Sequence, residues 1–304
     1  MAALGRYSRQ TVSGTGEFLS IKPLVSIIIV NHRAKAVLED CLTAIGDSSL
    51  SASLEVIIVN NPPEDDLSFI ENFGALNIRI IPTEKRLGFG AACNLGVRGS
   101  SGDILLLLNP DVILKKDAIE NLKVFVSDST EKRITVGRLT DPNGNFQPSC
   151  RKFPTISNIL FSRGSFLGKI AGKTNGIYTL PDYLTPTQVE SGAAALMMIF
   201  AETYNELNGF DESFFMYMED TDLCYRHFLN KGSVWFVPEA EGVHKWGYST
   251  GQYRFRRILW HHFSVWKYFL KHYHRSPGEI IFLPILLFAN CCLSLLAEMC
   301  SLRK

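Results

Sequence analysis

The sequence predicts an α/β protein in which a mostly parallel sheet is flanked by helices and followed by amphipathic and hydrophobic C-terminal helices. Short apolar runs alternate with segments of helical periodicity along the first two thirds of the chain, as expected when helical crossovers connect parallel strands. Hydrophobic residues make up 46% of the 304-residue chain, which excludes a mainly disordered protein. Near the C-terminus, residues 280–297 contain no charge.

Four apolar runs in the first 110 residues are predicted strands, and the first has the composition of a strand buried on both faces, whereas the third is weaker. They are Val25–Val30, Leu54–Val59, Ile78–Ile81 and Ile104–Leu108. Helical spacing of apolar residues separates or follows these runs at 38–45, 89–97 and 117–126. These alternating elements are the basis for the predicted sheet.

The second half of the domain continues this pattern after a stretch rich in Gly, Pro, Ser and Asn, residues 140–187, which predicts loops. Residues 193–200 and 234–237 are typical of strands. Residues 220–230 predict a helix, and Gly232 lies just beyond its end as a stop signal.

Charge is distributed unevenly, although the formal net charge is only +1. Residues 1–241 hold 22 basic and 28 acidic side chains, whereas the basic collar (residues 242–278) holds seven basic side chains and no acidic one. This asymmetry predicts a surface partner for the collar, and the near-zero total argues against a nucleic-acid binder. The seven cysteines show no CxxC or zinc-ligand spacing, which predicts separate thiols in a reducing compartment.

The C-terminal region predicts two helices. Apolar residues recur every three or four positions from Leu259 to Tyr273, with Lys267 and Lys271 off this stripe, which indicates a basic amphipathic helix. As a helix, the uncharged residues 280–297 would reach about 27 Å, which is marginal for spanning a bilayer. We therefore divide the chain into a flexible leader without a secretory signal (1–21), a main domain (22–250) and membrane-associating helices (251–304).

Polar residues follow three of the predicted strands: Asn31, then Asn60 and Asn61, then Asn109, Pro110 and Asp111. Because ligands of open parallel sheets bind beyond the carboxyl ends of the strands, we expect one convergent polar site there. The carboxylate of Asp111 is the kind of ligand that a hard divalent cation takes, with phosphates and water completing the shell. The alternative is that Asp111 is an ordinary turn residue.

A second polar cluster places five carboxylates within twelve residues, among aromatic and methionine side chains: Asp211, Glu212, Glu219, Asp220 and Asp222. Acids at the start of a helix interact favourably with its dipole, which is a structural explanation for the last two. The bulky stretch Phe214–Met218 could instead desolvate a neighbouring carboxylate and raise its pKa toward use as a general base. His244, after the last predicted strand, could reach a metal or diphosphate, although a lone histidine is more often structural.

These motifs together resemble the family 2 glycosyltransferases, and within them the bacterial rhamnosyltransferase-like branch, over residues 24–249. The matching stretches are Val25–Asn31, Leu87–Gly90 with Asn94 and Gly96, Gly102–Asp111, the segment 147–154 with Arg151 and Phe153, Ser191–Ala194 and Gly209–Cys224. Each motif is weak alone, and their order and spacing together carry the resemblance.

The resemblance implies a GT-A fold and an inverting glycosyltransferase that moves a sugar from a nucleotide-diphosphate sugar to a glycan or lipid-linked acceptor in bacterial cell-surface polysaccharide synthesis. It implies rhamnose or a related deoxyhexose, with dTDP-rhamnose as the donor. Asp111 and His244 would hold Mg²⁺ or Mn²⁺, and Asp220 would be the catalytic base, with Glu219 beside it. The implied donor-binding residues are Asn31, Asn61, Arg86, Gly88, Asn94, Asn109, Gly192 and Ala193.

One position departs from the family pattern. The strand end that usually reads Val-Asp-Asn is Val59-Asn60-Asn61 here, which removes a negative charge near the nucleotide. Residues 62–66, Pro-Pro-Glu-Asp-Asp, are also unusual.

The implied acceptors suggest a role for the tail. Glycans on polyprenyl-diphosphate lipids are anionic and confined to the bilayer, where a basic aromatic helix lies well at the interface. The positive-inside rule places the collar in the cytoplasm, so we expect the enzyme at the inner face of the cell membrane. The alternative is that the tail packs on a second subunit in a homodimer.

Two other functions must be weighed. A non-catalytic, membrane-attached binding or scaffold protein of the same fold is favoured by Asn60 and opposed by the intact Asp111 and Asp220. A nucleotidyltransferase would need a Gly-rich, Arg-containing loop after the first strand, which Asn31–Ala34 does not supply.

Overall fold

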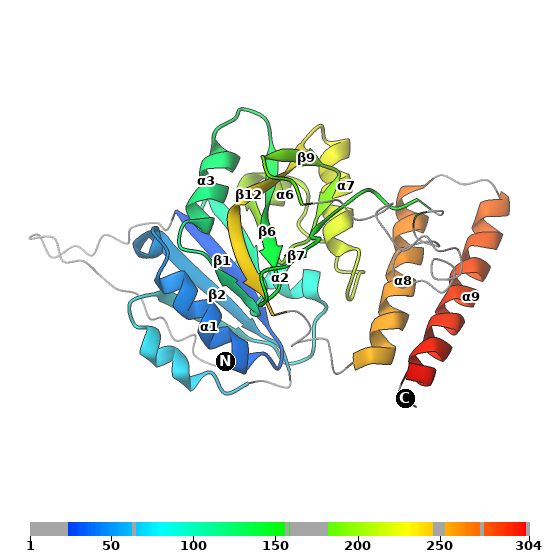
Figure 1. Cartoon of the computed structure of the whole chain (residues 1–304), viewed down its shortest axis with the longest axis horizontal. Coiled ribbons are helices and arrows are strands. Elements are labelled where there is room, and N and C mark those ends of the chain that lie inside the picture. Colours follow the sequence, from blue (N-terminus) through cyan, green and yellow to red (C-terminus); the bar gives the residue numbers. More distant parts are fainter. Residues whose placement is uncertain are drawn as a thin grey trace, which may run out of the picture.

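The computed structural model describes residues 24–62, 65–155, 158, 182–245, 253–273 and 277–301. The predicted leader lies outside these residues. A ten-stranded sheet forms the centre of the molecule, in the order β3-β2-β1-β4-β11-β6-β12-β5, with β7 paired to β6 and β9 to β12 (Figure 1).

The first half of the sheet is parallel, as predicted. It comprises β1 (Val25–Asn31), β2 (Leu54–Asn60), β3 (Asn77–Pro82) and β4 (Ile104–Leu108). Every residue of β1, β2 and β4 is buried, which explains their continuous apolar composition. Val25 pairs with both Leu54 and Ile104, so the carboxyl ends of these three strands meet at one edge.

The second half of the sheet is mixed. Strand β11 (Leu196–Phe200) runs antiparallel to both β4 and β6 (Arg133–Thr140), and β12 (Ser233–His244) runs parallel to β6. The edge strand β5 (Val112–Leu114) is antiparallel to β12. The short strands are β7 (Phe146–Gln147) and β9 (Thr187–Val189), and β8 (Cys150–Arg151) pairs with β10 (Ser191–Gly192) in a separate small sheet.

Strand β12 is much longer than the four residues predicted for it. Residues 238–241, Pro-Glu-Ala-Glu, are typical of a turn, but a register shift between Val237 and Glu241 accommodates them as a bulge. The strand therefore continues to His244, which pairs with Val112 of β5. His244 is the last residue of this strand rather than part of a following loop.

Helices cover both faces of the sheet. One face packs on α1 (Lys35–Gly46), α3 (Ala118–Ser127) and the short helix η2 (Ser68–Phe73). A second short helix, η1 (Ser51–Ser53), directly precedes β2 and has no buried residue. The other face packs on α2 (Phe89–Arg98), α6 (Ala201–Glu206) and α7 (Glu219–Leu229). Adjacent residues of β1 enter different cores: Ile27 joins the cluster of α1, and Ile28 joins that of α2.

Two C-terminal helices, α8 (Arg254–His272) and α9 (Pro277–Ser301), stand side by side next to the domain (Figure 1). A third core joins them to the domain: Phe214, Met218, Val265, Tyr268, Phe269, Leu283 and Leu287. By length and composition, Leu283–Cys300 is a candidate membrane span, with a mean hydropathy of 1.9 and 24% of the window buried. All seven cysteines are free thiols.

Candidate active site

Asp111 and His244 lie next to each other at the carboxyl edge of the sheet. Asp111 lies between β4 and β5, and His244 ends β12, so the pairing of β5 with β12 brings them together. Nε2 of His244 lies 3.2 Å from Oδ1 of Asp111. Both residues are buried, with 7% and 5% of their surface exposed, and the backbone N–H of Lys245 donates to the carbonyl of Asp111 at 2.8 Å.

Gln147 determines which nitrogen of His244 carries the proton. The Gln147 amide donates from Nε2 to the backbone carbonyl of His244 at 3.0 Å, which leaves its Oε1 facing Nδ1 of His244 at 3.0 Å. Nδ1 must therefore donate to this oxygen, and in the neutral ring Nε2 carries the lone pair. Nε2 is buried beside the Asp111 carboxylate without a hydrogen-bond partner, so a neutral ring would place two acceptors side by side at this edge.

A divalent cation fits this arrangement. An imidazole lone pair and a carboxylate oxygen that face each other are suitable metal ligands, and the Gln147 contact is the outer hydrogen bond that commonly fixes a ligating histidine. Among the described residues, no cluster of three or more His, Cys, Asp or Glu side chains could hold a metal. A cation bound by Asp111 and His244 would therefore take its remaining ligands from phosphate oxygens and water.

The segment from Gly192 to Ala195 connects this pair to α7. On one side, the backbone N–H of Asn109 donates to the carbonyl of Ala195 at 3.0 Å. On the other side, Sγ of Cys224 in α7 lies 3.9 Å from the carbonyl of Gly192. A Cβ at Gly192 would come within 2.6 Å of the Val136 side chain, so only glycine fits there. Asn109, two residues before Asp111, and Cys224, in the helix that carries Glu219 and Asp220, thus contact the same short segment, which includes Ala193.

Glu219 and Asp220, two of the three acids in the first turn of α7, lie in different environments. Glu219 is buried, and burial, followed by the nearby charge of Asp220, raises the pKa of Glu219 to about 8. Its Oε2 has no hydrogen-bond partner. Asp220 is partly exposed and accepts the backbone N–H of Thr221 at Oδ1 over 2.7 Å. Among the described residues, Oδ2 of Asp220 accepts no hydrogen bond, so it can receive a proton.

Glycines allow α2 to approach this region closely. A Cβ at Gly88 would lie 2.5 Å from the carbonyl oxygen of Phe215, and one at Gly90 would lie 2.8 Å from Cβ of Phe210. The backbone N–H of Phe89, in the first turn of α2, donates to the same Phe215 carbonyl at 3.0 Å. Gly88 therefore packs against the segment that precedes Glu219.

The carboxylate of Asp65, which was not predicted as part of the site, lies at the end of β1. Asn31 is fully buried, and its Nδ2 donates to Asn60 Oδ1 at 2.8 Å and to Asp65 Oδ2 at 3.1 Å. The backbone N–H of Lys35 also donates to Asp65 Oδ2, at 3.1 Å. The loop after β2 thus places the carboxylate of Asp65 at the edge of the sheet where Asn60 stands in place of the usual acid. The acidic run 64–66 was the only sequence signal for it.

Two of the predicted donor-binding asparagines have their amides used by the protein itself. Asn61 donates to the carbonyl of Leu87 at 3.0 Å and accepts its N–H at 3.0 Å. Asn94 donates to the carbonyl of Phe210 at 2.9 Å, and its Oδ1 accepts the N–H of Phe210 and the hydroxyl of Tyr204. Both asparagines hold loops of the site in place.

Arg86 lies within a group of aromatic rings. Its guanidinium carbon is 4.5 Å from the ring centre of Tyr253, 5.1 Å from that of Trp260 and 5.4 Å from that of Phe215. Nε2 of His32 is 3.1 Å from the Tyr253 hydroxyl, and burial, then the charge of Arg86, lowers the pKa of His32. Arg86 therefore joins the segment between β3 and α2 to the start of α8.

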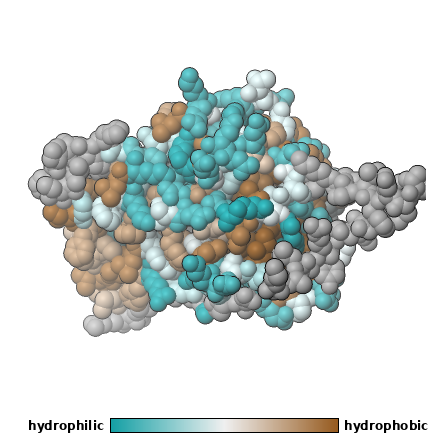
Figure 2. Space-filling model, turned by 180° about the vertical axis from the view of Figure 1, so that it is seen from behind, coloured by the Kyte–Doolittle hydropathy of each residue, from teal (hydrophilic) through white to brown (hydrophobic). Residues whose placement is uncertain are grey.

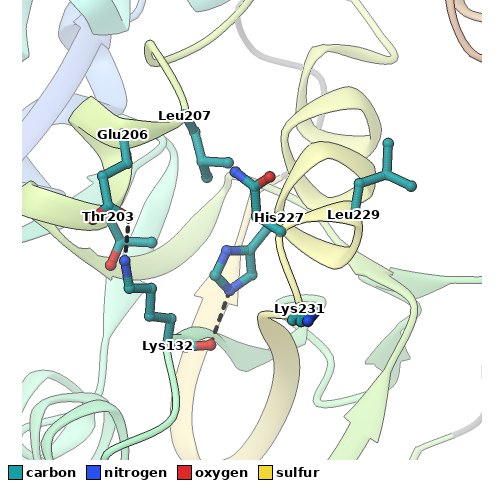
Figure 3. Close-up of a pocket in the computed structure, with 8 residues that line it drawn as sticks. Lys132, Thr203, Glu206, Leu207, His227, Leu229 and Lys231 are labelled. Atoms are coloured by element: carbon teal, nitrogen blue, oxygen red, sulfur yellow. Dashed lines mark hydrogen bonds and ion pairs between the residues drawn. The ribbon is translucent and has the colours of Figure 1, made fainter.

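A separate cavity of about 500 Å³ is lined by Lys132, Thr203, Glu206, Leu207, His227, Leu229, Asn230 and Lys231 (Figure 3). The cavity lies near the start of β6. Ile134 of β6 pairs with Ile199 of β11, and the next residue of β11, Phe200, pairs with Ile104, the first residue of β4. The cavity is thus at the opposite edge of the sheet from Asp111. Lys132 forms an ion pair with Glu206, and its carbonyl contacts His227 Nε2 at 3.1 Å.

Comparisons with known proteins identify the family and the fold. The family model "Glycosyl transferase family 2" matches residues 26–170. The chain is 28% identical over 189 residues to the rhamnosyltransferase WbbL of Escherichia coli K12, covering 60% of this chain and 69% of that protein. It is 30% identical over 207 residues to an N-acetylglucosaminyl-diphospho-decaprenol L-rhamnosyltransferase of Mycobacterium tuberculosis, covering 62% and 66%. The chain thus spans about two thirds of the length of these relatives.

Solved structures are similar in fold. The mannosyltransferase PcManGT from Pyrobaculum calidifontis, in complex with GDP-Man and Mn²⁺, superposes with a TM-score of 0.55 and 17% identity, covering 93% of this chain and 75% of that one. GalNAc-T7 with UDP, GalNAc and Mn²⁺ gives a TM-score of 0.55 at 14% identity, covering 75% and 44%. With its GT-A fold and family 2 motifs, the chain belongs to glycosyl transferase family 2.

Proposed function

We propose that this chain is an inverting, metal-dependent glycosyltransferase that moves a sugar from a nucleotide-diphosphate sugar to a glycan or polyprenyl-diphosphate-linked acceptor in cell-surface polysaccharide synthesis. The observation that supports it most is the buried pair of His244 and Asp111 at the carboxyl edge of the sheet, with Nε2 of His244 lacking a hydrogen-bond partner 3.2 Å from the carboxylate. Cys224, in the helix that carries the α7 acids, contacts the Gly192–Ala195 segment to which Asn109 is also bonded.

Asp220 and Glu219 of α7 have different roles in the acid–base chemistry. Asp220 takes the proton from the acceptor hydroxyl as its oxygen attacks the anomeric carbon, because its Oδ2 is open and it is partly exposed. The raised pKa of Glu219 keeps that neighbour largely protonated near neutral pH, so it adds little negative charge beside Asp220. The sugar–phosphate bond breaks as the acceptor bond forms, which inverts the anomeric configuration.

Asp111 and His244 would hold a divalent cation, Mg²⁺ or Mn²⁺, whose chemistry is to offset negative charge on the departing nucleoside diphosphate. The solved structures of this fold that contain Mn²⁺ support a divalent metal. Asn109, two residues before Asp111, is bonded to Ala195, and together with the Gly192–Ala193 segment it would face the diphosphate and sugar.

The nucleoside end of the donor lies against Asn31 and Asp65 in this proposal. Oδ2 of Asp65 is occupied by Asn31 and Lys35, whereas its Oδ1 accepts no hydrogen bond from the described residues. This oxygen would accept a donor N–H or O–H and replace the charge absent at Asn60. Arg86 and Gly88 complete this side, and Asn61 and Asn94 position the surrounding loops.

The sugar and acceptor are proposed from the relatives. Both rhamnosyltransferases match across most of the domain, which supports rhamnose or a related deoxyhexose and dTDP-rhamnose as the donor. The name of the mycobacterial relative supports a diphosphate-lipid acceptor.

The surface of α8 and α9 supports a place at the inner face of the cell membrane. Large apolar side chains are exposed on α8 at Phe255, Leu259, Phe263 and Leu270, and on α9 at Ile285, Leu286, Phe288, Leu296 and Met299. Figure 2 shows hydrophobic side chains gathered at the lower left, on the side of these helices. Arginines 254, 256 and 257 lie in the first turn of α8, as expected for contact with anionic lipid.

A release assay tests the reaction class. The purified protein is incubated with a panel of nucleotide sugars and Mg²⁺ or Mn²⁺, with and without a polyprenyl-diphosphate glycan acceptor. We expect acceptor-dependent release of nucleoside diphosphate. In a parallel incubation with a nucleoside triphosphate and a sugar 1-phosphate, release of pyrophosphate would instead indicate a nucleotidyltransferase. Donor binding without release would indicate a non-catalytic protein.

A further inference from the structure

The turn that leads into the catalytic acids is held in an unfavourable backbone conformation. Tyr217 and Met218, the two residues before Glu219, have φ angles of 69° and 70°, in the left-handed region that side-chain-bearing residues rarely occupy. Met218 is also the N-cap of α7 and provides no side-chain cap. Such conformations persist only where the surrounding structure holds them.

Helix α8 supplies much of that support on one side. The hydroxyl of Ser264, which is 2% exposed, donates to the carbonyl of Met216 at 2.9 Å. Nζ of Lys267 donates to the carbonyl of Ser213. Met218 packs in the same core as Val265 of α8. The opposite side of the turn rests on α2, through the Phe89 N–H to Phe215 carbonyl bond.

The same helix also holds the first turn of α7. Asp222, two residues after Asp220, has no exposed surface. Its Oδ1 lies 2.7 Å from Nζ of Lys271 and 2.6 Å from Nε2 of His272, while Arg226 of α7 reaches its Oδ2 at 2.8 Å. Two of the three basic partners of this buried carboxylate thus come from α8, about fifty residues further along the chain.

We infer that α8 is a positioning element for the proposed general base, with Ser264 and His272 as positioning residues that hold the strained turn and the start of α7. This rests on the proposed function, in which Asp220 is the base. The outer side of α8 carries the apolar residues proposed to contact the membrane, so the helix that binds the bilayer would also set the geometry of the acids.

Hydrogen exchange tests the structural part without any substrate. Ser264→Ala and His272→Ala should each accelerate exchange across residues 213–222 at least tenfold, including the Asp222 amide, which donates to the Met218 carbonyl at 2.8 Å. His272→Gln, which can still donate to Asp222, should change exchange less than His272→Ala does. Ser100→Ala is the matched control, because its hydroxyl also donates to a carbonyl, that of Val97, at 2.8 Å in another part of the domain. Exchange at 213–222 that equals the control in both test variants would overturn the inference.

A double-mutant cycle tests the action through Asp220. Ser264→Ala should lower kcat about tenfold and change the KM for the nucleotide sugar less than twofold. In an Asp220→Asn background it should cause no further loss, because both changes remove the same step. An equal loss in both backgrounds would show that Ser264 acts elsewhere and would overturn the inference. If Asp220→Asn retains the wild-type rate, the assignment of the general base fails, and the exchange experiment still decides whether α8 holds the turn.

Discussion

Nε2 of His244 lies 3.2 Å from Oδ1 of Asp111, and Nδ1 of the same ring lies 3.0 Å from Oε1 of Gln147. The two residues are 133 positions apart in the sequence, and the pairing of β5 with β12 brings them together. Both residues are buried at the carboxyl edge of the sheet, where we propose that they hold a cation.

Removing the carboxylate should abolish metal-dependent donor binding. We expect Asp111→Ala to weaken binding of nucleoside diphosphate in the presence of Mn²⁺ at least tenfold in calorimetric titrations, because one of only two protein ligands is lost. Asp128→Ala, an exposed acid at the end of α3, is the control for the change in charge. Titrations of Asp111→Ala that match wild type would refute the proposed metal site.

Glu219 should make stability depend on pH. Burial and the charge of Asp220 raise the pKa of Glu219 from 4.5 to about 8, so between these values the native state retains a proton that the unfolded chain releases. The free energy of unfolding should therefore fall as pH rises through this window, by up to about 1.4 kcal/mol per pH unit. Glu219→Gln removes this contribution, so urea unfolding should show its stability relative to wild type increasing from pH 5 to pH 8. A difference that stays constant over this range would contradict the raised pKa.

Asp65 should contribute to donor binding in place of the acid missing at position 60. We expect Asp65→Asn to raise the Kd for the nucleotide sugar about tenfold, because the amide has the shape but not the charge of the carboxylate. Asp66→Asn is the matched control, since this neighbouring acid is exposed and pairs with Lys35 at 3.2 Å. Equal Kd values for the two variants would assign Asp65 a purely structural role.

The exposed apolar side chains of α8 should drive binding to anionic membranes. We expect Leu259→Gln with Phe263→Gln to reduce flotation with phosphatidylglycerol vesicles at least tenfold, because each side chain is about half exposed and free to enter the interface. Val124→Gln with Phe228→Gln likewise replaces one aliphatic and one aromatic side chain by glutamine, at residues that are 54% and 57% exposed on other helices. If both pairs bind vesicles equally, α8 is not the membrane surface.

The parallel half of the sheet could be predicted from the sequence because strands buried on both faces are continuous apolar runs, as β1 and β4 are. The extension of β12 could not be predicted, since Pro238 and the two following glutamates resemble a turn and only the bulge admits them. The antiparallel direction of β11 depends on long-range pairing that local composition does not encode.

For the site, sequence patterns identified residue types but not their partners. Asn61 and Asn94 looked equivalent to Asn31 as ligands. In both of them, however, the amide oxygen as well as the nitrogen is hydrogen-bonded, to Leu87 and Phe210 respectively, whereas Oδ1 of Asn31 has no partner. Contacts between distant segments, such as Gln147 with His244 and Asp222 with His272, have no local signal.

The most direct test of the account is the turnover of Asp220→Asn. This change preserves size and removes the basicity of the one α7 carboxyl group that is both partly exposed and open at Oδ2. We predict that acceptor-dependent release of nucleoside diphosphate falls by about 10² to 10⁴-fold, with the donor Kd and the thermal midpoint close to wild type. A folded Asp220→Asn protein that transfers sugar at the wild-type rate would contradict the account.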